Sequence, residues 1–255
     1  MDLNLNDRVA LVTGASQGIG AAVAAQFAAE GCHVHIAARS GDRLESLASE
    51  LRARHGVAIT PHSCDLSRHE DVLALAAACP APDILVNDAG AIPAGGLLDI
   101  DLAKWKAAWD LKVFGYIGLT QAILPRMFER RSGVIVCVIG ATAFRPNPDY
   151  IAGCMANVAL NMFVSCLGGQ AFNHGVRVCA VNPGATESER QVYFHKDAAR
   201  RKLGDPERYT ELLKDHPAGR IATCEEIANT VAFLASDKSS YTSAAAITID
   251  AGYRG

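Results

Sequence analysis

Short apolar runs rich in β-branched residues alternate along the chain with longer segments in which apolar residues recur every three or four positions. The short runs predict strands and the longer segments predict helices. The predicted strands cover residues 8–14, 33–39, 58–65, 83–90, 133–140, 176–184 and 245–250, and the predicted helices cover about 18–31, 43–55, 68–79, 102–130 and 150–174. This order repeats the βαβ unit, so the expected fold class is α/β with a doubly wound parallel sheet.

The chain has the length and composition of one large α/β domain. It has 255 residues, of which 50% are hydrophobic and 20% are charged, and single α/β domains commonly reach this size. No linker, internal repeat or low-complexity segment interrupts the pattern. One polar and irregular stretch, 185–218, follows a Pro-Gly pair and predicts a mobile helical flap over the substrate. We therefore expect a single domain over 1–255 that carries this flap.

The charge and the cysteines exclude several classes of protein. The formal net charge is -3, without long runs of one sign, so nothing favours nucleic acid or an anionic membrane as a partner. The N-terminus has no basic leader and no long apolar stretch follows it, which predicts a soluble cytoplasmic protein. The 8 cysteines are scattered without CxxC spacing and predict free buried thiols. His33 and His35 share one face of a strand, but no third ligand accompanies them, so we expect no metal.

A glycine-rich turn, "TGASQGIG", follows the first predicted strand and opens the first predicted helix. Glycines in this context let backbone N–H groups approach a pyrophosphate at the N-terminus of a helix. The spacing is G-x-x-x-G-x-G, with Gly14, Gly18 and Gly20. A tight strand-to-helix turn without a ligand would need the same glycines, so the turn alone does not establish a nucleotide site.

The ordered set of motifs resembles the short-chain dehydrogenase/reductase family over nearly the whole chain. The resemblance rests on this turn and on "CDLS" with Asp65, "NDAG" at 87–90, Tyr150, "NPG" at 182–184 and "PAGRIATCEEIANTVAFLASDKSSY" near the end. It implies a Rossmann-type fold, a nicotinamide cofactor and a homodimer or homotetramer. Together with the glycine-rich turn and the charge at Arg39, the resemblance gives as candidate cofactor-binding residues Gly14, Ser16, Gln17, Gly18, Ile19, Gly20, Arg39, Asp65, Leu66, Asn87, Ala89, Gly90, Pro183 and Gly184.

Charge at the end of the second predicted strand indicates which cofactor binds. In dinucleotide-binding folds an acidic residue there binds the ribose 2′-hydroxyl, whereas an arginine accommodates a 2′-phosphate. Here the strand ends in "AAR", with Ala38 at the acidic position and Arg39 after it. A guanidinium binds a phosphate through charge-assisted bonds, and no carboxylate is present to repel it. The pattern favours NADP(H) over NAD(H), and the alternative is that Arg39 is an ordinary solvated arginine.

The catalytic set that the resemblance implies is incomplete. Reductases of this family use a Tyr-x-x-x-Lys helix turn, a serine upstream of the tyrosine and an asparagine on the preceding long helix. Tyr150 is present, but Cys154 stands at the lysine position and Gly140 at the serine position. Lys112 in "WDLKVFG" falls where the asparagine belongs.

The loss of the lysine leaves the tyrosine without the charge that lowers its pKa. A phenol titrates near 10, so bringing it toward neutrality takes about 3 pKa units, or roughly 4 kcal/mol of charge stabilisation. Lys112 is the candidate source, because its long side chain could carry an ammonium into the space of the missing lysine. We hypothesise that Tyr150 is the proton donor and that Lys112 supplies the positive charge. The alternative is that Lys112 extends to solvent.

The remaining site residues are predicted from the loop before Tyr150 and from the flap. Thr142 is the nearest hydroxyl that could replace the serine, although ordinary loop capping explains a threonine there equally well. The basic stretch 194–202 could meet an acidic substrate tail or could be a solvated helix face. The expected pocket edge is apolar and aromatic, which predicts a small hydrophobic carbonyl or alcohol as substrate. Its residues are Ile92, Phe144, Pro146, Tyr193 and Phe194.

Taken together, these features predict an NADP(H)-dependent oxidoreductase that moves hydride between the nicotinamide and a ketone or secondary alcohol. Two alternatives stay open at this point. One is a non-redox enzyme of the same fold, such as a lyase, that uses Tyr150, Lys112 and Cys154. The other is a non-catalytic protein that binds a dinucleotide and acts as a sensor or partner.

Overall fold

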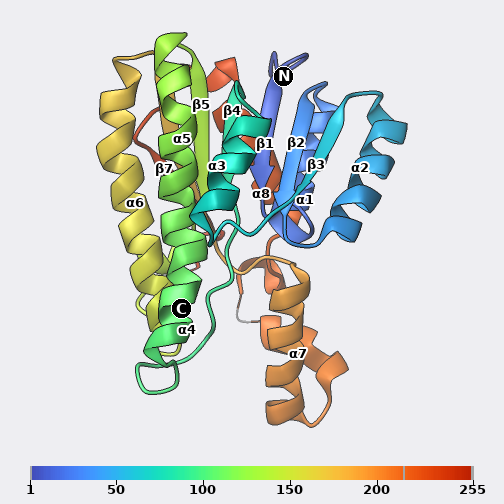
Figure 1. Cartoon of the computed structure of the whole chain (residues 1–255). Coiled ribbons are helices and arrows are strands. Elements are labelled where there is room, and N and C mark those ends of the chain that lie inside the picture. The colour runs from blue at the N-terminus through green and yellow to red at the C-terminus, as the bar shows by residue number, and fades with distance from the viewer. Residues whose placement is uncertain (1, 215, 254–255) are drawn as a thin grey trace.

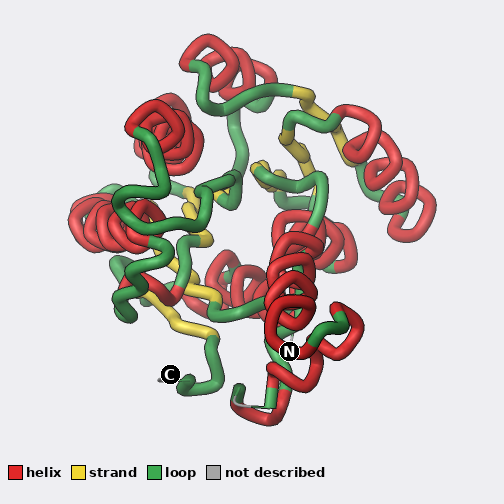
Figure 2. The backbone as a smooth tube through the Cα atoms, turned by 90° about the horizontal axis from the view of Figure 1, so that it is seen from below, coloured by secondary structure: helices red, strands yellow, loops and turns green. Residues whose placement is uncertain are grey.

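The computed structural model describes residues 2–214 and 216–253, with the backbone alone at 190, 194 and 218. In these residues one 7-stranded parallel sheet lies between two layers of helices (Figures 1 and 2). The strand order is β3-β2-β1-β4-β5-β6-β7, so the chain reverses its direction of winding between β1 and β4. The predicted fold class is confirmed. The strands are β1 (Val9–Thr13), β2 (His33–Ala38), β3 (Ile59–Ser63), β4 (Ile84–Asn87), β5 (Gly133–Val138), β6 (Val176–Pro183) and β7 (Ala246–Ile249).

Two buried clusters, one on each face of the sheet, hold the three layers together. The first face is covered by α1 (Gly18–Ala29), α2 (Gly41–His55) and α8 (Cys224–Ala235). The second face is covered by α3 (His69–Ala78), α4 (Leu102–Trp109), α5 (Gly115–Glu129) and α6 (Ile151–Phe172). The central strands are buried on both sides, as their continuous apolar sequences predicted.

The helix predicted over 102–130 is correct in extent but not in regularity. A π-helical turn, Asp110–Phe114, separates α4 from α5. A π turn holds one more residue than an α turn and often marks a functional site. Here the buried residues of the turn are Lys112 and Val113. The irregular turn therefore brings a lysine to the inner side of a helix whose sequence pattern showed only an apolar face.

The helix α6 is long and apolar enough to pass a test for a membrane span, with a mean hydropathy of 1.6 over its best window. It packs along β6 and buries residues on its inner face, among them Ala152, Ala156 and Leu160. A core helix passes the same test, so this single helix is weak evidence for a membrane.

The stretch predicted as a flap lies below the carboxyl ends of the strands (Figure 1). It contains α7 (Glu189–Leu203), a 3-10 segment (Pro206–Leu213) and a short turn (Pro217–Gly219). Arg43 of α2 connects the start of α7 to the glycine-rich turn. Its guanidinium lies 3.2 Å from Glu189 Oε2 and also donates a hydrogen bond to Gln17. The helical content of this stretch agrees with the sequence, and its action as a mobile flap over the substrate stays a prediction.

A pair of histidines joins β2 to β3. His35 and His62 stack with ring centroids 5.1 Å apart, and the His35 Nδ1 and His62 Nε2 atoms are 2.9 Å apart. Burial lowers the pKa of both rings, and the neighbouring His62 lowers that of His35 further. Both rings are therefore neutral in the folded protein at neutral pH, where one nitrogen donates and the other accepts.

This pair is expected to make stability depend on pH. A lowered folded-state pKa means that the unfolded state binds protons first, so the contribution is complete above about pH 6.5 and is lost as the pH falls below it. Thermal unfolding of the wild type should lose more Tm between about pH 6.5 and 5 than the His35→Gln, His62→Gln double variant does. The matched control is the exposed His69→Gln on α3, which should follow the wild type. Parallel curves for the wild type and the double variant would contradict the assignment.

Candidate functional site

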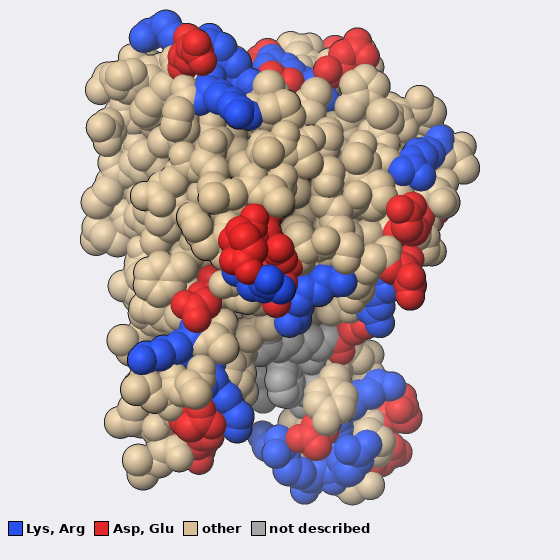
Figure 3. All heavy atoms as spheres, viewed as in Figure 1, with Lys and Arg blue, Asp and Glu red and all other residues tan. Residues whose placement is uncertain are grey.

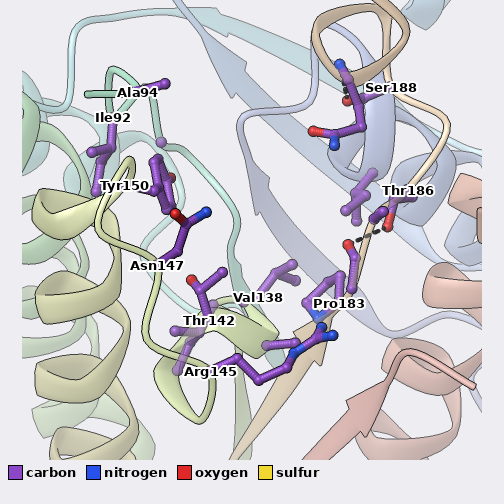
Figure 4. A pocket seen from close by; sticks show the side chains of 18 of the residues that line it. Ile92, Ala94, Val138, Thr142, Arg145, Asn147, Tyr150, Pro183, Thr186 and Ser188 are labelled. Atoms are coloured by element: carbon purple, nitrogen blue, oxygen red, sulfur yellow. Dashed lines mark hydrogen bonds between the residues drawn. The ribbon is translucent and has the colours of Figure 1, made fainter. Parts of the chain in front are cut away.

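A cavity of about 710 Å³ opens at the carboxyl ends of β4, β5 and β6 (Figure 4). In doubly wound sheets ligands bind in the crevice where the winding reverses, and the size is that of a small-molecule site. Its walls come from the glycine-rich turn, the segment after β4, the segment between β5 and α6, the end of β6 and the flap. Among the residues that line it are Ile19, Asp88, Gly90, Ile92, Lys112, Thr142, Tyr150, Pro183, Gly184, Ser188 and His216.

The glycine-rich turn has the geometry of a pyrophosphate cradle. Gly14 has a φ of +70°, and a Cβ there would lie 3.0 Å from the backbone of Ala89. A Cβ on Gly20 would lie 2.5 Å from the Gly14 carbonyl oxygen. The first turn of α1 receives no side-chain cap from Gln17 and contains no acidic residue. The Asp88 carboxyl accepts a hydrogen bond from the Gly20 N–H at this N-terminus. The lack of any acidic residue within the first turn of α1 itself fits the binding of a dinucleotide phosphate.

The turn after β4 is fastened to this cradle by Thr13. The Thr13 Oγ1 accepts hydrogen bonds from the N–H groups of Asp88 at 3.0 Å and Ala89 at 3.2 Å. Burial raises the pKa of the Asp88 carboxyl to about 8, against the opposing effects of Lys112 and of the N–H of Gly20. At neutral pH this carboxyl is therefore largely protonated and does not repel a phosphate beside the turn.

Other residues that the resemblance assigned to the cofactor lie around the cavity or behind it. Asn87 is buried, and its Nδ2 donates to Thr120 Oγ1 at 3.3 Å, so its side chain joins β4 to α5. Leu66 belongs to the core of the second sheet face. Ser16 is half-buried and Gln17 is exposed, and a Cβ on Gly18 would lie 3.5 Å from Ser188 Cβ.

The predicted adenosine end lies at the carboxyl ends of β2 and β3. Arg39 is exposed there. Burial raises the pKa of Asp65, but hydrogen bonds from Ser67 and the charges of Arg39 and Arg68 outweigh it and lower that pKa. The Arg39 guanidinium and the Asp65 carboxylate are therefore electrostatic neighbours, and their contacts with a cofactor stay a prediction.

Tyr150 stands at the entrance of α6 and points into the cavity near Ile92 and Ala94 (Figure 4). Its ring lies back over the first helical turn because Gly153 leaves room for it. A Cβ on Gly153 would lie 2.0 Å from the Cε1 atom of Tyr150. The backbone before the tyrosine is held by the Gly95 N–H, which donates to the Asp149 carbonyl at 2.6 Å.

Lys112 turns inward, so the alternative that it extends to solvent is wrong. Its exposed fraction is 8%, and its Nζ donates to the carbonyl of Ile139 at 2.7 Å and to Asn157 Oδ1 at 2.9 Å. Gly90 leaves room for its stem, since a Cβ there would lie 3.1 Å from Lys112 Cδ. An ammonium is thus present in the wall that also carries Tyr150.

Thr142 also lines the cavity, in a short helical turn (Ala141–Ala143) after β5. Its Oγ1 accepts a hydrogen bond from Asn157 Nδ2 at 2.7 Å. The loop therefore folds inward, and the Thr142 hydroxyl lies in the cavity wall. The sequence prediction named this residue but could not show the inward fold.

Cys154 lies on the other side of the loop. Its Sγ faces the carbonyl oxygens of Arg145 at 3.9 Å and Asn147 at 3.8 Å. Among the described residues, Cys154 is not one of those that line the cavity. Its geometry is that of a thiol that holds the loop, which gives no support to a nucleophilic role.

Sequence reasoning missed Asn157, which joins two of the predicted residues. It lies two helical turns after Tyr150, and its exposed fraction is 2%. The available signal was a polar residue on the buried face of α6, between Ala156 and Leu160. Without the neighbouring segments in place, that signal did not identify a partner.

The predicted apolar edge is only partly assembled. Ile92 and Pro146 line the cavity, whereas Phe144 and Tyr193 are 62% and 65% exposed and are not among its described lining residues. The side chain of Phe194 lies outside the described residues. The lining also carries polar groups, namely Arg145, Asn147, Gln191 and His216.

Arg145 is fixed by the end of the chain. Its guanidinium donates to the Tyr253 carbonyl at 2.9 Å, lies 3.5 Å from Asp250 Oδ2 and covers the Tyr253 ring, on which His216 stacks. Arg145, His216 and Tyr253 all line the cavity. For metal binding, the described part of the chain brings together no group of three or more His, Cys, Asp and Glu side chains.

A doubly wound sheet with a glycine-rich turn and a cavity at its switch point is the arrangement in which this class of fold binds dinucleotides. The family model described as Enoyl-(Acyl carrier protein) reductase matches residues 14–254. The chain is 31% identical to D-threitol dehydrogenase of Mycolicibacterium smegmatis, over 99% of this chain and 95% of that protein. It is 29% identical to 2,3-dihydro-2,3-dihydroxybenzoate dehydrogenase of Bacillus subtilis, over 97% of this chain and 96% of that protein.

Solved structures show the same likeness. L-sorbose reductase from Gluconobacter frateurii, complexed with NADPH and L-sorbose, superposes with a TM-score of 0.92 at 30% identity, covering 99% of this chain and 98% of that chain. The chain therefore belongs to the short-chain dehydrogenase/reductase family. It is an oxidoreductase of this family, whose members bind a nicotinamide dinucleotide.

Proposed function

We propose that the protein is an NADP(H)-dependent reductase or dehydrogenase that interconverts a ketone and a secondary alcohol, with Tyr150 as acid/base. When bound, the nicotinamide supplies or accepts the hydride. The observation that carries the proposal is one cavity wall with a phenol, an ammonium and a hydroxyl, from Tyr150, Lys112 and Thr142. The facing wall is the Pro183–Gly184 turn at the end of β6, beside the glycine-rich cradle.

Each of the three side chains has a distinct part in the proposed reaction. Tyr150 donates its phenolic proton to the carbonyl oxygen during reduction and removes the hydroxyl proton during oxidation. Lys112, held on a carbonyl and an amide oxygen, stabilises the phenolate and so lowers the pKa of the tyrosine. Thr142 accepts from Asn157 and can donate its own proton to the substrate oxygen.

The preference for NADP(H) is supported by the basic edge at the ends of β2 and β3. Arg39 is exposed where the 2′-phosphate of a dinucleotide lies in this class of fold, and Ala38 offers no carboxylate to repel it. Arg43, one turn into α2, adds a second guanidinium that reaches the glycine-rich turn through Gln17. L-sorbose reductase, the similar structure described above, binds NADPH.

Replacing Arg39 by glutamine should separate the two cofactors. Charge-assisted hydrogen bonds contribute about 1.5–3 kcal/mol each, so NADPH affinity should fall about 10–100-fold. NADH affinity should change by less than about threefold, because no phosphate is lost from that complex. Quenching of tryptophan fluorescence from Trp105 and Trp109 gives the affinities. Arg54→Gln on the exposed side of α2 is the matched control, and equal losses for both cofactors would contradict the proposal.

For the substrate, we propose a small carbonyl or alcohol with an apolar part against Ile92 and Pro146. The apolar part agrees with the hydrophobic substrate expected from the sequence, and we place it at the end of the cavity next to Tyr150. The polar lining from Arg145, Asn147 and His216 supports a hydrogen-bonding group at the other end. Related chains act on polar substrates, as the names D-threitol dehydrogenase and L-sorbose reductase state.

The proposed function is tested by the loss of NADPH absorbance with a panel of ketones that differ in polarity. Turnover with oxidation of the cofactor supports it. Substrate turnover without a change in the nicotinamide would instead support the lyase alternative, and tight cofactor binding without any turnover would support a sensor. The position of Cys154, outside the described cavity lining, gives the lyase alternative no support.

We also propose that the enzyme acts in the cytoplasm as a homodimer or homotetramer. Support comes from the outer face of α6, where Met155, Val158 and Met162 are exposed. Figure 3 shows that the part of the surface over α6 carries hardly any charged side chains between its upper and lower edges. Sedimentation or light scattering would give the oligomeric state.

A further inference from the structure

The cavity wall contains a chain of hydrogen bonds that the sequence motifs did not indicate. Asn157 Oδ1 accepts from Lys112 Nζ at 2.9 Å, and Asn157 Nδ2 donates to Thr142 Oγ1 at 2.7 Å. An ammonium can only donate, so the amide oxygen must face Lys112 and the amide nitrogen must face Thr142. The chemistry of the partners thus fixes the orientation of the amide.

The amide group sets the donor direction at both of its partners. Because Thr142 Oγ1 accepts from Asn157, its own proton is directed elsewhere, toward the cavity that Thr142 lines. Because Lys112 donates to Asn157 and to the carbonyl of Ile139, its ammonium is held at one place beside the same cavity. One buried side chain therefore orients both groups that support Tyr150 in the proposed function.

The space for this amide exists because position 140 is a glycine. Gly140 has a φ of +150°, and a Cβ there would lie 2.7 Å from Asn157 Nδ2. A serine at this position would bring its side chain into the volume that the amide fills. The side chain of Asn157 therefore depends on the glycine at 140, where the family has a serine, although the two residues lie on different elements.

A second pair of amides holds the first in place. Asn161 and Asn182 exchange hydrogen bonds at 3.1 and 2.9 Å, and Asn182 Oδ1 also accepts from the N–H of Gly140 at 3.2 Å. Asn161 Nδ2 donates as well to the backbone carbonyl of Asn157 at 2.8 Å. The network runs without a break from Lys112 to the end of β6, so each member has little freedom to shift.

We propose that Asn157 is the positioning residue of the active site, whose amide holds the Lys112 ammonium and the Thr142 hydroxyl in their working arrangement in the space that Gly140 leaves. The inference rests on the proposed function for the roles of Tyr150 and Lys112. It adds that Lys112, Thr142 and Asn157 act together in place of the missing serine and lysine.

Two variants test the proposal. Asn157→Leu removes both hydrogen bonds and should lower kcat about 10²-fold, the scale of losing one oriented donor. Asn157→Asp keeps the shape but places a carboxylate beside Lys112 and cancels its field. Both variants should move the rising limb of the pH profile for alcohol oxidation to higher pH, because the phenolate of Tyr150 loses its stabilisation. KM for NADPH should stay within about threefold of the wild type.

The pH profile separates positioning from a merely structural role. Loss of packing alone would lower Tm and the active fraction but would leave the limb where it is in the wild type. Asp88, whose pKa Lys112 lowers, and Tyr116, which interacts with Tyr150, face the same groups, and both residues are kept in every variant. Thr142→Val should lower kcat in the wild type and have no further effect in Asn157→Leu. Gln170→Leu, on the exposed side of the same helix, is the matched control.

Failure of the inference is distinguishable from failure of the proposed function. If the wild type binds NADPH but no ketone of the panel causes the oxidation of NADPH, the proposed function fails. The NMR signals of the Lys112 ammonium then decide the inference, because its protons should exchange slowly with water in the wild type and rapidly in Asn157→Leu. An unmoved pH limb in both active variants, or an unchanged ammonium signal, overturns the proposal.

Discussion

Replacing Tyr150 by phenylalanine is expected to lower kcat by about 10²–10⁴-fold, the usual contribution of a positioned general acid or base. The phenyl ring can keep its place over Gly153, where the absence of a Cβ makes room for it. The variant therefore loses the hydroxyl and little else. NADPH affinity should stay within about threefold, since the glycine-rich cradle and Arg39 are untouched.

Steady-state kinetics and a fluorescence titration of the same preparation check this prediction. Tyr241→Phe is the control, because Tyr241 is exposed and is not among the described residues of the cavity. Activity above about a tenth of the wild type in Tyr150→Phe would remove the tyrosine from the proton transfer.

Replacing Lys112 by methionine is expected to have the second large effect. The effect on the rate differs between alcohol oxidation and ketone reduction. In the proposed function the ammonium stabilises the phenolate of Tyr150, so its removal takes that stabilisation away. Alcohol oxidation needs the phenolate, so its rate at about pH 8 should fall on the order of 10²-fold. Ketone reduction needs the protonated phenol, so its falling limb should move to higher pH.

The measurement is the pH dependence of kcat in both directions. Methionine keeps the stem that packs beside Gly90, but it leaves the oxygens of Ile139 and Asn157 without their donor. This loss costs about 1–3 kcal/mol for each unpaired group, so Tm is recorded alongside. Lys106→Met on the exposed side of α4 is the control. If the rising limb of the pH profile for alcohol oxidation stays at its wild-type position in Lys112→Met, the proposed role of Lys112 is contradicted.

Much of the fold was predictable because its signals are local. Apolar runs such as "RVALVTG" identify buried parallel strands, and the strand–glycine turn–helix order identifies the cradle. The π-helical turn at Asp110–Phe114 was not predictable, because Lys112 finds its acceptors just after β5 and on α6. Those acceptors lie 27 and 45 residues away in the chain.

The candidate site was predictable only as a set of separate residues. Tyr150 and Lys112 were recognised from the motifs in which they stand, and the inward fold of Lys112 follows from Gly90, which leaves space for its stem. Asn157 has no motif of its own. Its meaning comes from Gly140 and Thr142, which only the folded chain brings against it.

The most direct test of the account is a double-mutant cycle on the rate of alcohol oxidation at about pH 8, followed as NADPH formation, with Tyr150→Phe, Lys112→Met and the two combined. If Lys112 acts through the tyrosine, its charge has no purpose once the hydroxyl is gone, and the double variant should be no slower than Tyr150→Phe alone within about twofold. If the two losses multiply, Lys112 and Tyr150 act independently, and the proposal that the ammonium replaces the missing lysine is wrong.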